Sequence, residues 1–218
     1  MKKKSKRVFW VGASLLVAFV LWTGLVCVVD VQAIGPCGSS VGFATLNGYV
    51  HNLTGVNMSI YTLTDWLGLV PIGVALGFAV LGLVQWIQRK KLCKVDRSIL
   101  ALGLFYIVVM AVYVLFETIV INYRPVLINE CLEASYPSST TVLVMSVMPT
   151  AMLQLRFRIK NDLFRRCAML AVAVFIAFMV IGRLLSGVHW VTDIIGGALF
   201  SSGVVLTYYS IGNIAEQE

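Results

Sequence analysis

Residues 99–121 read ILALGLFYIVVMAVYVLFETIVI, an apolar run in which Glu117 is the only charged residue. A helix needs about 20 apolar residues to cross the hydrocarbon core of a bilayer. A β-barrel would instead show segments of about 10 residues with alternating polarity. We therefore predict a transmembrane helix over Ile99–Ile121.

Five further apolar runs predict helices of the same kind. They are Val8–Val29, Leu67–Ile87, Thr141–Leu155, Cys167–Leu185 and Trp190–Tyr209. The fourth helix of the chain, Thr141–Leu155, is short and contains Pro149, so we expect it to tilt little or to begin earlier, near Pro137. The sequence thus predicts an all-α, polytopic membrane protein with six transmembrane helices, which form a single membrane domain over residues 1–218.

The composition of the 218 residues agrees with this class of protein. The chain is 59% hydrophobic and only 12% charged, whereas a soluble domain is typically about 25% charged. These values exclude a disordered chain, a disulfide-stapled secreted scaffold and an ordinary soluble enzyme. The net charge of +7 would otherwise suggest a nucleic-acid partner, so its distribution along the chain matters.

Most basic residues lie in three groups of five, which together hold 15 of the 17 Lys and Arg residues. The groups are Lys2, Lys3, Lys4, Lys6 and Arg7; Arg89, Lys90, Lys91, Lys94 and Arg97; and Arg156, Arg158, Lys160, Arg165 and Arg166. Positively charged loops stay cytoplasmic, and alternation of six helices puts all three groups on one side. We therefore expect both termini to be cytoplasmic and no nucleic-acid partner. Arg124 and Arg183 are left on the outer side.

The segment after the first helix, about residues 32–66, is long and mixed in character, and we interpret it as an outer-side cap. It is expected to contain a short interfacial helix at Val41–Val50 or at Ile60–Leu67. Cys37 and Cys131 both fall on the outer side, where they form either a disulfide or two free thiols.

Four ionisable residues at the outer ends of the predicted helices are candidates for a functional site, because charge near a bilayer is costly. They are Arg124, Arg183, His189 and Asp193. His189 and Asp193 are four residues apart and share one helix face, so the carboxylate can accept the imidazole Nδ1–H and leave Nε2 as a free nucleophile or base. The two guanidiniums suit a phosphate. Structural roles are the alternative: Arg124 as an interfacial anchor, Arg183 directed to the surface and the His–Asp pair as a packing hydrogen bond.

Three motifs resemble one known family. Residues 182–196, GRLLSGVHWVTDIIG, resemble the third signature of the membrane-bound type 2 phosphatidic acid phosphatase family, which is Ser-Arg, five residues, His, three residues, Asp. Arg124-Pro125 resembles the end of the first signature, and residues 135–140, SYPSST, resemble the second, Pro-Ser-Gly-His. The resemblance covers residues 117–197, and the order and spacing of the motifs agree with a six-helix member of this family.

The resemblance implies a phosphatase that works through a phosphohistidine and needs no metal or other cofactor. His189 would attack phosphorus, Asp193 would orient its ring, and Arg124 and Arg183 would hold the phosphoryl oxygens. Ser138 and Ser139 would complete the phosphate cradle. The expected substrate is a lipid phosphate or pyrophosphate in the outer leaflet of a bacterial plasma membrane, with the site facing the extracellular or periplasmic side.

The chain departs from the family pattern at three positions. Thr140 stands where the second signature has the histidine that serves as general acid, Glu117 stands where the first has a lysine, and Gly182 replaces the serine of the third. These changes are compatible with a slow phosphatase, a natural variant that uses another acid, an engineered inactive form, or a catalytically impaired member that binds lipid phosphates in a regulatory or carrier role.

The missing histidine also bears on the substrate and on a replacement acid. A phosphate leaving group needs less protonation than an alkoxide, so the loss favours a lipid pyrophosphate such as polyprenyl (undecaprenyl) pyrophosphate. Substitute acids on the outer side are His51, Glu130 and Glu133, and the alternative for His51 is a solvated loop residue.

Overall fold

The structure, a computed structural model, describes residues 3–215, with side chains for residues 5–156 and 159–211. Its long elements are α-helices, which confirms the all-α class. In chain order they are α1 (Lys3–Val28), α2 (Ala44–Thr54), α3 (Met58–Leu67), α4 (Leu69–Arg89), α5 (Arg97–Thr118), α6 (Ser139–Arg158), α7 (Asp162–Leu185) and α8 (Val191–Ala215). Two 3-10 turns, Pro36–Gly38 and Leu92–Lys94, lie between them. Lys2, which belongs to the first basic group, lies outside the described residues.

Each of the six predicted apolar runs coincides with one long helix. Within the described residues, five helical segments are long and apolar enough to cross a membrane: Ser5–Val28, Met58–Arg89, Arg97–Thr118, Asp162–Leu185 and Val191–Ile211. Helix α6 is of similar length but more polar, because it carries Ser146, Thr150 and Gln154, all of which are buried. The chain is therefore a multi-pass membrane protein, and a sixth crossing by α6 stays a prediction.

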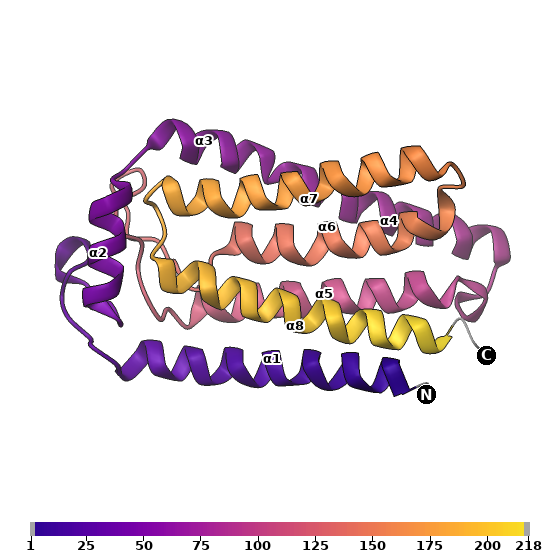
Figure 1. Ribbon diagram of the computed structural model, residues 1–218, viewed down its shortest axis with the longest axis horizontal. Coiled ribbons are helices and arrows are strands. Elements are labelled where there is room, and N and C mark those ends of the chain that lie inside the picture. The colour runs from indigo at the N-terminus through magenta and orange to yellow at the C-terminus, as the bar shows by residue number, and fades with distance from the viewer. Residues whose placement is uncertain (1–2, 216–218) are drawn as a thin grey trace.

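The polar helix α6 lies in the middle of the bundle. It packs against α4, α5, α7 and α8, while α1 packs along α8 on the outside (Figure 1). The start of α1, the α4–α5 connection and the α6–α7 connection lie at one end of the bundle, and α2 and the loops before α6 and α8 lie at the other (Figure 1). The described residues of the three basic groups therefore lie at the end opposite the predicted site.

Helices α1 and α8 approach closely because small residues face each other. A Cβ atom on Gly12 would lie 2.9 Å from the carbonyl oxygen of Gly203, and one on Gly203 would lie 2.9 Å from the side chain of Leu16. Small residues at helix interfaces let backbones meet in a bilayer. This contact fixes α8, whose first turn carries part of the site.

The cap folds back over the site end of the bundle. The sequence predicted one short helix at either of two positions, and helices form at both, as α2 and α3. The Asn47 amide donates to Thr192 Oγ1 at 3.0 Å, which joins α2 to the start of α8. Gly187 has a φ of +66°, and a Cβ there would lie 1.9 Å from the carbonyl oxygen of Gly55. The α2–α3 turn is thus seated directly on the α7–α8 turn, and α3 runs back along α7 (Figure 1).

The five cysteines are all free and exposed. Cys37 and Cys131, for which the sequence left a disulfide open, are therefore two free thiols.

Candidate active site

His189 lies in the turn between α7 and α8, and its side chain is 1% exposed. Its Nδ1 atom is 3.1 Å from Ser135 Oγ, and its Nε2 atom has no hydrogen-bond partner among the described residues. Ser135 donates its single hydroxyl proton to Asp193 Oδ2, so the serine oxygen must accept from Nδ1–H. This assigns the proton of the neutral ring to Nδ1 and leaves the lone pair of Nε2 free to attack.

Asp193 supports this ring through Ser135 rather than directly. Asp193 Oδ2 is 3.7 Å from His189 Nδ1, which is longer than a hydrogen bond. The same oxygen accepts from the Ser135 hydroxyl and from the backbone N–H of Trp190 at 2.9 Å. The sequence predicted the His–Asp pair but not the serine between its members, because the helical spacing of the pair does not show what the loop before α6 inserts.

Burial also sets the ionisation of His189. Loss of hydration lowers the pKa of His189 from its usual 6.5 to about 4; the charges of Arg124 and Arg183 act in the same direction, whereas Asp193 opposes them. The imidazole is therefore neutral, and able to act as a nucleophile, throughout the physiological range of pH.

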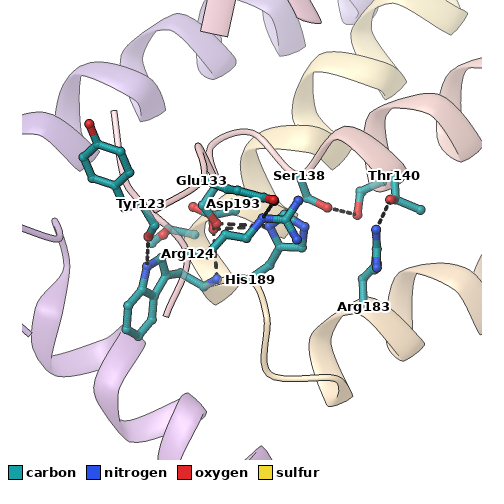
Figure 2. Close-up of polar contacts among 12 residues, drawn as sticks. Tyr123, Arg124, Glu133, Ser138, Thr140, Arg183, His189 and Asp193 are labelled. Carbon is teal, nitrogen blue, oxygen red and sulfur yellow. Dashed lines mark hydrogen bonds and ion pairs between the residues drawn. The ribbon is translucent and has the colours of Figure 1, made fainter. Parts of the chain in front are cut away.

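Arg183 lies in the last turn of α7, is 2% exposed and is held by three side chains. Its Nη2 atom donates to Asp65 Oδ1 at 3.0 Å and to Thr140 Oγ1 at 2.6 Å, and Nη1 donates to Thr64 Oγ1 at 3.4 Å. Figure 2 shows the contact with Thr140. The threonine at the position of the family histidine is thus a partner of the phosphate-binding candidate.

Arg124 comes from the loop before α6, and its Nε atom is 3.1 Å from Glu133 Oε2 (Figure 2). The backbones of these two residues are also paired, because Arg124 N–H donates to the Glu133 carbonyl at 3.0 Å. The ring of Tyr61 on α3 lies 5.9 Å from the guanidinium carbon of Arg124 and 5.0 Å from that of Arg183. Both guanidiniums therefore face one aromatic ring, and each contacts a carboxylate.

The serines at the start of α6 are used differently from the predicted cradle. The backbone N–H of Ser138 donates to the carbonyl of Asp193 at 3.1 Å, and its hydroxyl accepts from Thr141 at 3.1 Å. Ser138 is fully buried and fixes the position of Asp193, so its N–H is not available to a phosphate. Ser139 lines the cavity described below.

A cavity of about 640 Å³ lies between α4, α5 and α6. Most of its lining is apolar, and its polar residues include Asp65, Glu117, Ser135 and Thr140. Ser135 contacts His189 and Thr140 contacts Arg183. The polar part of an apolar cavity therefore adjoins both His189 and Arg183.

The structure also places the remaining candidates. His51 packs on Trp190 with a ring separation of 5.5 Å, its pKa is lowered by burial, and no contact joins it to Arg124 or Arg183 among the described residues. Glu130 lies in an exposed turn. In the described part of the chain, no group of three or more His, Cys, Asp or Glu side chains is placed to hold a metal ion.

Sequence reasoning missed Asp65 and Tyr61, which reach the site from the cap. One signal was present: Gly182 precedes an arginine in a helix, and small residues in membrane helices mark close neighbours. A Cβ on Gly182 would lie 2.8 Å from Thr64 Cγ2, so the glycine admits α3, which carries Asp65, against α7.

Comparison with known proteins identifies the family. A search of curated proteins gave no match. Among solved structures, the chain is similar to the crystal structure of a transmembrane PAP2-type phosphatidylglycerolphosphate phosphatase from Bacillus subtilis, with 20% identity, a TM-score of 0.54 and coverage of 95% of this chain and 97% of that one. The model of the PAP2 superfamily matches residues 98–215, which is more than half of the chain and includes all three motifs. The resemblance seen in the sequence is confirmed: the chain belongs to the PAP2 superfamily.

Proposed function

We propose that the protein is an integral-membrane phosphatase that hydrolyses a lipid phosphate or pyrophosphate through a covalent phosphohistidine on His189. The observation that carries this proposal is the free Nε2 atom of a neutral, buried histidine. Two arginines that share the Tyr61 ring lie at the same end of the bundle. PAP2 family membership supports the same reaction.

The residues have distinct roles in this mechanism. Arg124 and Arg183 bind the phosphoryl oxygens, and Nε2 attacks phosphorus as the bond to the leaving oxygen breaks. The ring becomes positively charged, and Asp193 stabilises this charge through the Ser135 hydroxyl. Water then attacks the phosphohistidine, which releases phosphate and restores the neutral ring.

The cavity beside the site favours a substrate with a long hydrocarbon chain. Its volume of about 640 Å³ and its largely apolar lining suit an acyl or prenyl chain rather than a soluble metabolite. Polyprenyl (undecaprenyl) pyrophosphate is the preferred candidate, because its leaving phosphate is a weaker base than an alkoxide. The solved neighbour is a phosphatidylglycerolphosphate phosphatase, which makes that lipid phosphomonoester the second candidate.

The arrangement of charges supports a site in the outer leaflet of a bacterial plasma membrane. The described residues of the three basic groups lie at the end of the bundle opposite the site (Figure 1), and basic segments stay cytoplasmic. A cysteine introduced at Asn52 in the cap is then accessible to an impermeant thiol reagent in intact cells, in a background from which the native cysteines are removed.

Phosphate release by the purified protein tests the activity. We expect release from polyprenyl pyrophosphate, slower release from phosphatidylglycerolphosphate and phosphatidic acid, and none from any of them by His189→Ala. Faster turnover of phosphatidic acid than of polyprenyl pyrophosphate would overturn the substrate preference, and undiminished release by His189→Ala would overturn the mechanism.

A second function is favoured by the departures from the family pattern. The site has Thr140 in place of the acid, and a carboxylate already contacts each arginine. A catalytically impaired protein that binds lipid phosphates would be compatible with both features. Saturable binding of these lipids without release of phosphate from any of them would assign this role.

A further inference from the structure

We propose that Asp65, a residue of the cap, is the general acid of this site. The inference rests on the proposed phosphatase function and adds a catalytic residue to it. In the first step, the Asp65 carboxyl protonates the oxygen that leaves phosphorus. In the second step, the resulting carboxylate accepts a proton from the attacking water.

The position of Asp65 suits this task. Its Oδ1 atom is 3.0 Å from Nη2 of Arg183, and the same nitrogen is 2.6 Å from Thr140 Oγ1. Two oxygens that share one nitrogen cannot be further apart than the sum of these two distances. The carboxylate therefore lies beside the phosphate-binding guanidinium and beside the residue that stands in the place of the family acid.

The cavity indicates where the leaving oxygen sits. Asp65 and Thr140 line it, whereas Arg124, Arg183 and His189 are not among its lining residues. A lipid with its chain in the cavity and its phosphoryl group on the arginines has its ester oxygen between the two regions. Phosphoryl transfer places the leaving oxygen on the side of phosphorus away from the attacking Nε2. Asp65 lies at this boundary between the arginine and the cavity.

The other acidic side chains around the site do not combine these two properties. Glu117 lines the cavity, but among the described residues the carboxylates that pair with Arg124 and Arg183 are Glu133 and Asp65, not Glu117. Glu133 contacts Arg124, and it is not among the lining residues of the cavity. Among the described residues, Asp65 is the carboxylate that both lines the cavity and contacts an arginine of the site.

A proton can reach Asp65 and be recycled without a further reactant. Its side chain is 57% exposed, so it exchanges protons with water. In the proposed complex, the carboxyl carries a proton that it has taken from water. That proton goes to the leaving oxygen as the Nε2–P bond forms and the P–O bond breaks. Water then forms the new P–O bond, its proton returns to Asp65, and the Nε2–P bond breaks.

The test compares two leaving groups in one protein preparation. Asp65→Asn keeps the shape and the hydrogen-bond acceptor for Arg183 but cannot supply the proton. General acid catalysis typically contributes about 10²–10⁴ in rate. We expect kcat to fall by at least about 100-fold for an alkyl phosphate lipid. Turnover of p-nitrophenyl phosphate, whose leaving group needs no proton, should change by less than about 5-fold, which also shows that the variant is folded.

Two further variants complete the design. Glu117→Gln removes the other cavity carboxylate and should show no dependence on the leaving group. Adding Thr140→His to Asp65→Asn places an imidazole at the family position and should restore part of the lost turnover of the alkyl phosphate.

The outcomes separate this inference from the proposed function. If Asp65→Asn lost turnover equally on both esters, or lost none on either, Asp65 would not be the general acid and would only be a partner of Arg183. A selective loss in Glu117→Gln but not in Asp65→Asn would give the role to Glu117. If the wild-type protein released phosphate from polyprenyl pyrophosphate but from neither ester, the acid role would fall and the proposed function would stand. If it released phosphate from none of the three compounds, the proposed function would be wrong and the acid role would fall with it.

Discussion

His189, Ser135 and Asp193 are each at most 3% exposed, whereas Asp65, which joins the site through Arg183, has a side chain that is 57% exposed. The first group, which we call the attacking half, is buried, although Ser135 also lines the cavity, and the imidazole of His189 has one defined protonation state. The second group, the leaving half, consists of Arg183, Thr140 and Asp65 and opens onto the apolar cavity. The comparison teaches that the two proposed steps have opposite requirements. Attack needs a lone pair on His189 Nε2 that is shielded from water, whereas proton delivery needs an Asp65 carboxyl that exchanges protons with water.

The departures from the family motifs fall on one side of this division. Thr140 and Gly182 belong to the surroundings of Arg183, and Glu117 lines the cavity. The attacking half keeps the histidine and aspartate of the signature. In the proposed mechanism, the chain therefore keeps the residues for nucleophilic attack and differs where the leaving group would be handled.

Removing the proposed nucleophile, His189, has the largest expected effect on activity. His189→Ala should lower kcat/KM by roughly 10⁴–10⁶-fold, as does loss of the nucleophile in enzymes whose residues act as a unit. Substrate labelled in its phosphoryl group should also leave an acid-labile label on wild-type protein and none on the variant. A labelled His189→Ala protein would place the covalent step on another residue.

Replacing each arginine compares Arg183, a residue of the leaving half, with Arg124, which belongs to neither half. Lysine is a point charge and cannot reproduce a fork that bonds three side chains, so Arg183→Lys should lower kcat/KM by about 10²–10³-fold. Arg124→Lys should lower kcat/KM by only about 10-fold, because the guanidinium of Arg124 is less buried than that of Arg183 and contacts the partly exposed Glu133. Steady-state kinetics on one substrate measure both, and the reverse order would contradict the weight given to Arg183.

Removing the serine between histidine and aspartate should have an intermediate effect. Hydrogen bonds to charged groups contribute about 1.5–3 kcal/mol, so Ser135→Ala should lower kcat by about 10–100-fold with little change in KM. Ser138→Ala is the matched control, because its buried hydroxyl bonds to Thr141 and not to the histidine. Equal losses in both variants would indicate that Ser135 only supports the loop.

The depressed pKa of His189 predicts a loss of stability in acid that belongs to the attacking half. The folded protein keeps this imidazole neutral down to about pH 4, whereas the unfolded chain takes up the proton below about 6.5. The unfolded state therefore binds more protons as the pH falls from 6.5 to 4, and roughly 2 kcal/mol of stability is lost by pH 5.

This effect is measured as the midpoint of thermal unfolding in detergent at pH 7 and pH 5. The wild-type midpoint should fall by about 4–8 °C more than that of His189→Gln, which has no group to titrate. Equal falls in the two proteins would mean that the acid sensitivity has another source.

The sequence predicted the helices well because a bilayer requires long apolar runs, and these runs end at clear charged or polar boundaries. It also singled out Arg124, Arg183, His189 and Asp193, since charges at the outer ends of membrane helices are unusual. Their roles in a site stay predictions. The polar character of α6 explains why its crossing stays a prediction: its Ser and Thr side chains are satisfied inside the bundle, which composition does not reveal.

The contribution of the cap was not predictable from local patterns. Asp65 reaches Arg183 only because α3 folds back along α7. The packing of α3 on α7 depends in turn on the close approach of the Gly187 backbone to the Gly55 carbonyl. The position of the Ser135 hydroxyl depends in the same way on the loop that precedes α6. Such contacts join residues more than 50 positions apart, and neither the helical period nor the motif spacing records them.

The smallest expected effect restores the family serine of the third signature and tests whether α3 must touch α7. A Cβ on Gly182 would lie 2.8 Å from Thr64 Cγ2, so Gly182→Ser should destabilise the contact by about 1–3 kcal/mol. Thr64→Ser removes that methyl group but keeps the hydroxyl that accepts from Arg183. The double variant should therefore recover most of the lost thermal midpoint. A Gly182→Ser protein as stable and active as wild type would show that the cap can move away from α7, and Asp65 would then not be held in the leaving half.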